Sequence, residues 1–223
     1  MALDLLLFGP PGAGKGTQAA AVARAAGVPH VATGDMFRGH LSQSSELGMQ
    51  AKAYMDRGAL VPDTITISML SERMTGSDAE AGVLLDGFPR TIGQAEALDG
   101  MLGERGRQVA ALLSIEVPAE ELVRRVSGRL VCRDCGKTFH ALEAPPRVAG
   151  VCDDCGGEVM RRVDDSEETV RARYAVFREQ TEPVLAYYRE FGTPIVTVDG
   201  ARDRAVVEAD LLAAISNLSP GPA

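Results

Sequence analysis

Short apolar runs alternate with longer polar and amphipathic segments along the chain, and glycine, proline or aspartate follows most of the runs. Five runs have the length and composition of buried strands, and they span residues 3–8, 30–32, 83–85, 109–115 and 195–198. The segments between them predict helices at 17–24, a pair of helices within 35–56, a helix from residue 63, and helices at 91–102, 119–126 and 205–218. Strands that alternate with helices at this spacing predict an α/β fold, in which about five parallel strands are flanked by helices.

Several residues stand where the predicted helices begin and end. Gly27 is a candidate C-cap, and Asp63 is a candidate N-cap for the helix that follows it. Asp165, with Glu168 three residues later, has the form of a capping box. The helix that begins there is long, and we expect it to kink near Pro183. One of its faces is marked by Val170, Tyr174, Phe177, Thr181, Val184 and Tyr188.

Composition and charge narrow the class of protein. The 223 residues are 45% hydrophobic and 24% charged, which excludes a disordered or collagen-like chain. Apolar runs stay shorter than the roughly 18 residues of a membrane span, and no positive charge precedes the first of them. We therefore expect no membrane anchor, no signal peptide and a cytoplasmic location. The net charge of −8 argues against non-specific binding of nucleic acid.

Composition changes between residues 128 and 165, where periodic apolar residues are few. The four cysteines of the chain form two Cys-x-x-Cys pairs there, separated by 16 residues: Cys132, Cys135, Cys152 and Cys155. This spacing is typical of tetrahedral zinc, and four thiolates leave no open position for water, so we predict a structural Zn²⁺ site. Disulfides, or iron or another thiophilic ion, are the alternatives. His140 is a further candidate ligand, although four cysteines already suffice.

A glycine-rich segment lies between the first predicted strand and the first predicted helix. Residues 9–17, Gly-Pro-Pro-Gly-Ala-Gly-Lys-Gly-Thr, fit the pattern Gly-x-x-x-x-Gly-Lys, with Gly16 where many phosphate loops have serine or threonine. Glycines allow successive backbone N–H groups to turn toward an anion, and the helix N-terminus adds partial positive charge. Lys15 supplies a full charge. The alternative, a tight turn with a surface lysine, is disfavoured because strand, loop and helix all agree with the motif.

Two further segments narrow the nucleotide chemistry. Thr-Gly-Asp-Met-Phe-Arg at 33–38 follows the second predicted strand, and Asp-Gly-Phe-Pro-Arg-Thr-Ile-Gly-Gln-Ala at 86–95 begins at the third. In open α/β sheets ligands bind beyond the carboxyl ends of the strands, so we expect both segments to meet the glycine-rich loop. With these motifs in this order, the chain resembles an adenylate kinase over nearly its whole length. The resemblance implies a P-loop NTPase-type fold, a monomer, and reversible phosphoryl transfer between Mg²⁺-ATP and AMP that yields two ADP.

The resemblance also implies roles for individual residues. Those expected to contact ATP are Gly12, Ala13, Gly14, Lys15, Gly16, Thr17, Arg125, Arg129 and, near the adenine, Arg202. Those expected to contact AMP are Thr33, Arg38, Gly58, Ala59, Leu60, Val61, Gly87, Arg90, Gln94, Arg162 and Arg173. Within this set Arg38 and Arg90 would hold the phosphate and Gln94 the adenine edge. Asp86 would orient the magnesium shell through water. The expected catalytic residues are Lys15, Arg90, Arg129, Arg162 and Arg173.

The resemblance further implies three parts of the chain. The core would comprise 1–31, 62–127 and 166–223, the segment 32–61 would bind the monophosphate, and 128–165 would be a zinc-binding lid that closes over ATP and excludes water. Two other functions stay open at this point: a kinase for another nucleoside monophosphate, and a nucleic-acid-binding or scaffold protein that uses the zinc ribbon. The acidic balance of the chain argues against the second.

Overall fold

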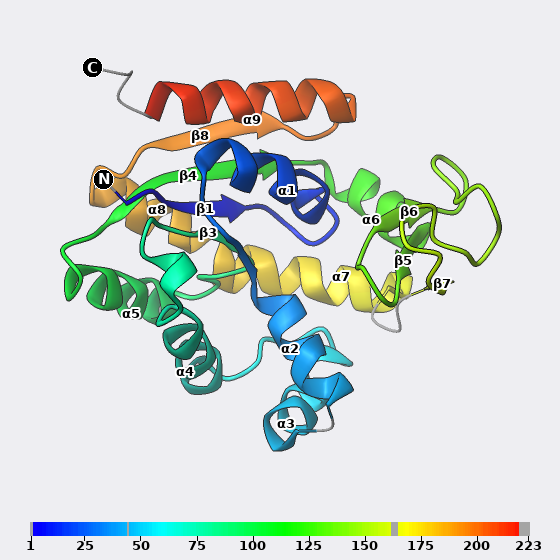
Figure 1. Cartoon of the computed structure of the whole chain (residues 1–223), viewed down its shortest axis with the longest axis horizontal. Coiled ribbons are helices and arrows are strands. Elements are labelled where there is room, and N and C mark those ends of the chain that lie inside the picture. The colour runs from blue at the N-terminus through cyan, green and yellow to red at the C-terminus, as the bar shows by residue number, and fades with distance from the viewer. Residues whose placement is uncertain (1, 44, 162–164, 219–223) are drawn as a thin grey trace.

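The computed structural model describes residues 2–43, 45–161 and 165–218, and a parallel five-stranded sheet lies at its centre (Figure 1). The strand order is β2-β3-β1-β4-β8, and every neighbouring pair is parallel. Each strand agrees within about one residue with a run predicted from the sequence: β1 Asp4–Phe8, β2 His30–Ala32, β3 Leu84–Asp86, β4 Val109–Glu116 and β8 Ile195–Asp199. The predicted α/β fold is therefore confirmed.

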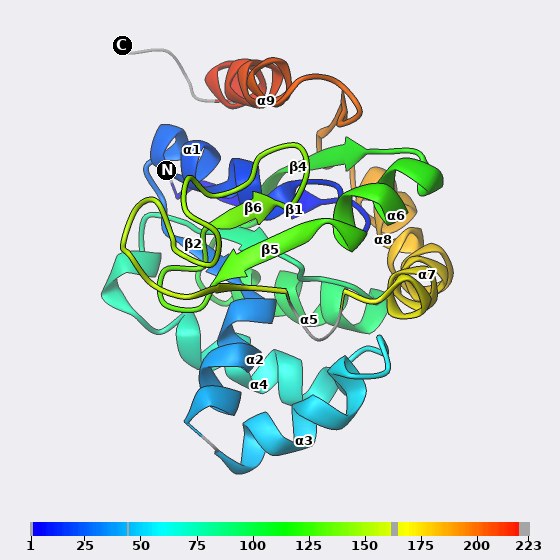
Figure 2. The ribbon, with the colours of Figure 1, turned by 90° about the vertical axis from the view of Figure 1, so that its right-hand side faces the viewer.

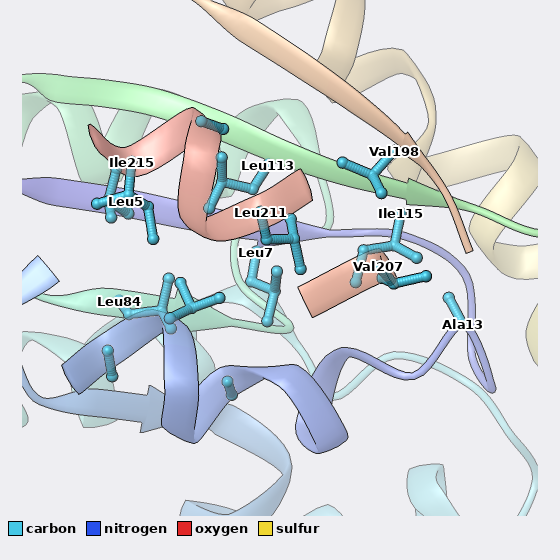
Figure 3. Close-up of a cluster of buried hydrophobic side chains, with 14 of the residues drawn as sticks. Leu5, Leu7, Ala13, Leu84, Leu113, Ile115, Val198, Val207, Leu211 and Ile215 are labelled. Atoms are coloured by element: carbon cyan, nitrogen blue, oxygen red, sulfur yellow. The ribbon is translucent and has the colours of Figure 1, made fainter. Parts of the chain in front are cut away.

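One face of the sheet is covered by α1 (Lys15–Ala26) and α9 (Arg204–Leu218). Alternate side chains of a strand point to the same face, so Leu5 and Leu7 of β1 lie together in this layer. Figure 3 shows them beside Leu113 of β4 and facing Leu211 and Ile215 of α9. All five side chains are at most 2% exposed, so this layer is closed to solvent at these positions.

The opposite face is covered by helices from the middle and the end of the chain. The intervening strand residues Leu6 and Leu112 point to this side and pack in one cluster with Leu98 and Tyr188. The covering helices are α4 Asp63–Arg73, α5 Ile92–Gly103 and α8 Pro183–Glu190. No helix in the described part of the chain combines the length and apolar character that a membrane span requires.

Two parts of the chain extend from this core. The first is the helical segment that follows β2, with α2 Thr33–Ser42 and α3 Glu46–Met55, and it has a small apolar cluster around Phe37, Ala51 and Val61. The second is the cysteine-bearing insert, which follows α6 Ala119–Ser127. Its strands form a separate antiparallel sheet of order β6-β5-β7, with bounds β5 Arg129–Cys132, β6 Thr138–His140 and β7 Val159–Met160.

Two predicted helix caps are wrong, and both errors involve a buried contact. Asp63 is the first residue of α4, and the N-cap is Pro62. The Asp63 carboxylate does not cap α4, because it accepts hydrogen bonds from Gln94 of α5 and from Thr91, the N-cap of α5. Asp165 does not cap α7 (Glu167–Val176); Ser166 does, by accepting the N–H of Thr169. The predicted C-cap Gly27 is confirmed, with a φ of 68° that suits glycine.

The long helix predicted from residue 165 stays helical through the region of Pro183. Between α7 and α8 the residues Phe177–Thr181 form a π-helical turn, in which the N–H of Glu182 donates to the carbonyl of Phe177 five residues earlier. Pro183 has no N–H to donate, so the widened turn occurs where a regular helical bond is missing. The helix is therefore widened next to Pro183, and the kink expected there stays a prediction.

Candidate active site

The functional motifs meet at the carboxyl ends of the main strands. The glycine-rich loop follows β1, α2 follows β2, and Asp86 ends β3, which lies between β1 and β2 in the sheet. The insert lies on this same side of the molecule, and Figure 2 shows β5 and β6 above α2 and α3. The crevice expected at the carboxyl ends of the strands is therefore bordered by the core, by α2 and α3, and by the insert.

The glycine-rich loop turns back on itself before α1. Gly14 has a φ of 94° and precedes the first helical residue, Lys15. A side chain at Gly12 would come within 2.5 Å of Cγ2 of Val126, so only glycine fits against α6 there. The Lys15 ammonium donates to the carbonyl oxygens of Gly9, at 2.7 Å, and Pro10, at 3.1 Å. The Lys15 side chain thus folds back over the glycine-rich loop, and backbone carbonyls of that loop accept hydrogen bonds from its ammonium group.

Electrostatics in the site centre on Lys15 and Asp86. Burial lowers the pKa of Lys15 to about 8, against the favourable charge of Asp86 and with the help of nearby arginines. Burial alone would raise the pKa of Asp86, but the hydrogen bond from His30 and the charge of Lys15 lower it below its usual value. The distance from His30 Nε2 to Asp86 Oδ2 is 3.4 Å. Asp86 is therefore an ionised, half-buried carboxylate, and no pattern in the sequence indicated His30 beside it.

A pocket opens between α2, α3 and the start of α5, and we call it the α2–α3 pocket. Ten of its lining residues are ones that the resemblance assigned to AMP: Thr33, Arg38, Gly58, Ala59, Leu60, Val61, Gly87, Arg90, Gln94 and Arg173. Its other lining residues are Gly34, Phe37, Met55 and Thr66, which were not predicted. Four separate stretches of the chain therefore converge on one cavity, as the motifs required.

Gly87 joins the walls of this pocket. Its carbonyl accepts the Thr33 hydroxyl at 2.9 Å and Nε of Arg90 at 2.7 Å. A side chain at Gly87, where φ is 78°, would come within 2.8 Å of the Arg90 guanidinium. Arg38 lies across Gly34 and pairs with Asp35. Two guanidinium groups thus line the pocket, each already oriented by a neighbouring residue.

Gln94 and Asp63 form a second network in the pocket wall. Gln94 is 2% exposed; its Nε2 donates to Asp63 at 2.6 Å and its Oε1 accepts the N–H of Arg90 at 2.8 Å. The Thr91 hydroxyl donates to the other carboxylate oxygen of Asp63 at 2.7 Å. Sequence reasoning assigned Asp63 only a capping role; a carboxylate two residues after the AMP-matching segment 58–61 was the one available signal.

Two of the predicted catalytic arginines share a buried carboxylate. Arg129, the first residue of β5, donates through Nε to Asp165 at 2.7 Å, and its NH2 forms a second bond to the same group. A guanidinium nitrogen of Arg173 lies 4.0 Å from Asp165, whose side chain is fully buried. Arg173 also passes Gly58: a side chain at that glycine would come within 2.8 Å of Cγ of Arg173. The predicted Arg162 lies outside the described residues.

The remaining predicted contacts to ATP lie near the junction of α6 and the loop before α9. Arg125 donates to Glu121 at 2.7 Å and to the carbonyl of Gly200 at 2.8 Å, so it spans from α6 to that loop. Arg202 is half exposed and pairs with Asp210 at 2.8 Å. Gly16 is exposed, whereas Ala13 is buried and Thr17 half-buried in the glycine-rich loop and α1.

The four cysteines converge in the insert. Their sulfur atoms all lie within 4.8 Å of one another, and Cys132 and Cys152 are buried whereas Cys135 and Cys155 are exposed. The structure contains no disulfide among them. Four convergent sulfur atoms fit the donor set that tetrahedral zinc requires. His140 is directed elsewhere: its Nδ1 accepts the N–H of Glu143 at 3.1 Å, and its ring lies against Gly128.

Comparison with known protein families gives the deciding observation, because residues 7–193 match the family described as "Adenylate kinase". The chain belongs to the adenylate kinase family. An adenylate kinase of Streptomyces griseus is 52% identical over 220 residues, which cover 98% of this chain and 100% of that relative. An adenylate kinase of Carboxydothermus hydrogenoformans is 51% identical over 209 residues, covering 94% and 97%. One from Archaeoglobus fulgidus is 49% identical over 201 residues, covering 90% and 92%.

Membership of the adenylate kinase family decides between the functions that the residues alone left open. The protein is a nucleoside monophosphate kinase, a phosphotransferase that interconverts ATP plus AMP and two ADP. The resemblance inferred from the glycine-rich loop and the two later motifs is confirmed. Adenylate kinases use Mg²⁺ with ATP, so an ionised carboxylate at the carboxyl end of β3 agrees with the chemistry of the family.

Proposed function

We propose that the α2–α3 pocket holds AMP and that the glycine-rich loop holds the phosphates of ATP, so that Lys15 faces the phosphoryl group in transfer. The observation that supports this assignment most directly is the gathering of ten AMP-assigned residues around a single cavity. Arg38 and Arg90 enter that cavity from two sides and supply forked donors suited to a phosphate. Gln94 presents its amide to the base.

On the ATP side, the backbone of residues 12–17 supplies N–H donors, and Lys15 supplies a mobile charge. Its ammonium donates to carbonyls in the structure, and exchanging these neutral acceptors for phosphate oxygens strengthens the hydrogen bonds. Arg125 and Arg129 would lie over the nucleotide, with Arg202 near its adenine. Asp86 would hold Mg²⁺ through water; the ion, when bound, neutralises phosphate charge.

The arginines account for most of the expected rate. Phosphoryl transfer needs little covalent help, so positioning and charge stabilisation dominate. Arg129 and Arg173 are held near one another by Asp165, and Arg90 lines the pocket, so three guanidinium groups would surround the transferred group. We propose these residues, with Lys15 and Arg162, as the catalytic set.

We further propose that residues 128–165 act as a lid, that 32–61 bind the monophosphate, and that the rest forms the core. The insert has its own sheet, and in its described part the apolar cluster has four buried side chains, two of them cysteines, which is too little to fold a segment of this size without a cross-link. Cys132, Cys135, Cys152 and Cys155 would hold a structural Zn²⁺, which orders the insert when bound.

We also infer a cytoplasmic monomer. Four thiols gathered for a metal require a reducing compartment, because an oxidising one would cross-link them. The residues that line the α2–α3 pocket come from several elements of one chain, which supports a monomer.

The test is a coupled assay of ADP formation from ATP, Mg²⁺ and AMP, with GMP, CMP and UMP in parallel, on protein whose zinc content is measured. We expect AMP to be the preferred acceptor and about one zinc ion per chain. Preference for another monophosphate would overturn the assignment of the base site, and a zinc-free protein with full activity and stability would overturn the metal assignment.

A further inference from the structure

The amide group of Gln94 is held at both of its ends. Its Nε2 donates to Oδ1 of Asp63, and its Oε1 accepts the backbone N–H of Arg90. A carboxylate can only accept and a backbone N–H can only donate, so neither partner tolerates an exchange of the two ends. Gln94 is almost fully buried, which leaves little room for water to replace either partner. The orientation of this amide is therefore fixed twice.

Asp63 is itself fixed. Its second oxygen, Oδ2, accepts the hydroxyl of Thr91, and the same hydroxyl oxygen accepts the N–H of Gln94 at 3.1 Å as the N-cap of α5. The three side chains thus form a closed ring between the first residue of α4 and the first turn of α5. The position of Asp63 in the first turn of α4 favours its negative charge.

The ring determines what the pocket offers to a base. A glutamine amide has two N–H donors and two acceptor lone pairs, and Asp63 and Arg90 use one of each. One N–H of Nε2 and one lone pair of Oε1 are left. A 6-amino purine matches this pair, because its amino group donates and its ring N1 accepts. A 6-oxo purine reverses both positions, so donor would meet donor and acceptor would meet acceptor.

We propose that Asp63 is a positioning residue for base selection: by fixing the amide of Gln94, it makes the site accept a 6-amino purine monophosphate and reject a 6-oxo one. This inference rests on the proposed function, in which AMP occupies the α2–α3 pocket. A buried hydrogen-bonding site that is mismatched to a ligand rejects it far more strongly than apolar contacts do, because polar groups are then left unpaired. Asp63 acts through Gln94 and has no contact of its own with the base.

The test is Asp63→Asn, which keeps the shape of the side chain but lets its end turn to present a donor. We expect the ratio of kcat/KM for AMP to kcat/KM for IMP to fall about tenfold, the effect of one ordinary hydrogen bond. The change should appear in the KM of the monophosphate, with the KM of ATP unaltered. The matched control is Glu120→Gln, which removes an exposed carboxylate from the first turn of α6, another helix that begins after a proline. We expect this control to keep the ratio of the unmodified enzyme.

The outcomes distinguish a failure of the proposed AMP site from a failure of the proposed role of Asp63. An unmodified enzyme that fails to phosphorylate AMP would overturn the proposed function. An unmodified enzyme that prefers AMP, with an Asp63→Asn variant whose ratio stays within about twofold of it, would overturn this inference alone. Thermal melting of both variants shows whether a loss of activity reflects loss of the fold.

A measurement on the unmodified protein covers the case in which the variant does not fold. In an NMR spectrum of ¹⁵N-labelled enzyme, we expect one side-chain amide proton of Gln94 to be shifted downfield and protected from exchange, because it donates to a carboxylate. The exposed side chain of Gln43 is the internal reference. Equal and rapid exchange of the two Gln94 protons would show that the amide is not held, and the inference would be wrong.

Discussion

The buried ammonium of Lys15 sets a pH dependence of folding that one substitution removes. Burial lowers the pKa of Lys15 from its ordinary value of 10.5 to about 8. In the unfolded chain the group keeps the ordinary pKa of a lysine. Between those two values the unfolded chain holds a proton that the folded protein has released, so the free energy of unfolding rises with pH. The whole rise is about 3 kcal/mol, and about 2 kcal/mol of it falls between pH 7 and 9.5.

Lys15→Met keeps the length of the side chain and removes the titrating group. Urea unfolding of both proteins at pH 7 and at about pH 9.5 gives four free energies of unfolding. The contributions of the other titrating groups are common to both proteins, so they cancel when the pH dependence of one protein is subtracted from that of the other. We expect the unmodified protein to gain about 2 kcal/mol relative to Lys15→Met over this interval. The variant should have almost no kinase activity at either pH. Parallel pH dependences of the two proteins would refute the reasoning, because they would show that the nitrogen titrates as it does in water.

Three further predictions concern the core, the pocket and the insert. Arg107→Met should lower the free energy of unfolding by about 3–5 kcal/mol in urea titration, because the Asp4 carboxylate, 1% exposed, loses its ion pair; a loss under 1 kcal/mol would contradict this. Gly58→Ala should raise the KM for AMP about tenfold or more, since its methyl group meets Arg173 and φ is 70°, and an unchanged KM would contradict it. Cys132→Ser should lower the zinc content and the melting temperature more than turnover in the cold, and an equal loss of turnover would indicate a catalytic metal.

The five strands of the main sheet could be predicted because each is a short, mostly apolar run, and the runs of β1, β3 and β4 are almost entirely buried, which is a local property of the sequence. Ten residues of the α2–α3 pocket were predicted by the resemblance to adenylate kinases, and two of the motifs that carry this resemblance follow strand ends, which a parallel sheet brings together. These predictions needed no knowledge of side-chain contacts. For the strands the local apolar pattern was sufficient, whereas the pocket residues also required the resemblance to a known family.

The errors occurred where a polar residue is used by a distant part of the chain. Asp63 and Asp165 both stand at helix starts, where capping is the local expectation, but their carboxylates are engaged by residues 28 to 36 positions away. His30 beside Asp86 and Arg107 on Asp4 were missed for the same reason. A buried carboxylate requires a partner, yet nothing in the local pattern says which cation the fold will bring to it.

The widened turn at Phe177–Thr181 also affects the direction in which the side chains of α7 point relative to those of α8. Each residue in a helix advances the direction of the next side chain by roughly 100°. Tyr188 of α8 is buried in the core, and Arg173 of α7 points at Asp165. The number of residues between Tyr188 and Arg173 therefore sets the direction of the Arg173 side chain around the helix axis. A single deletion within this span would leave both helices intact and rotate the arginine out of the crevice. The number of residues in this span is therefore as important for the placement of Arg173 as their identity.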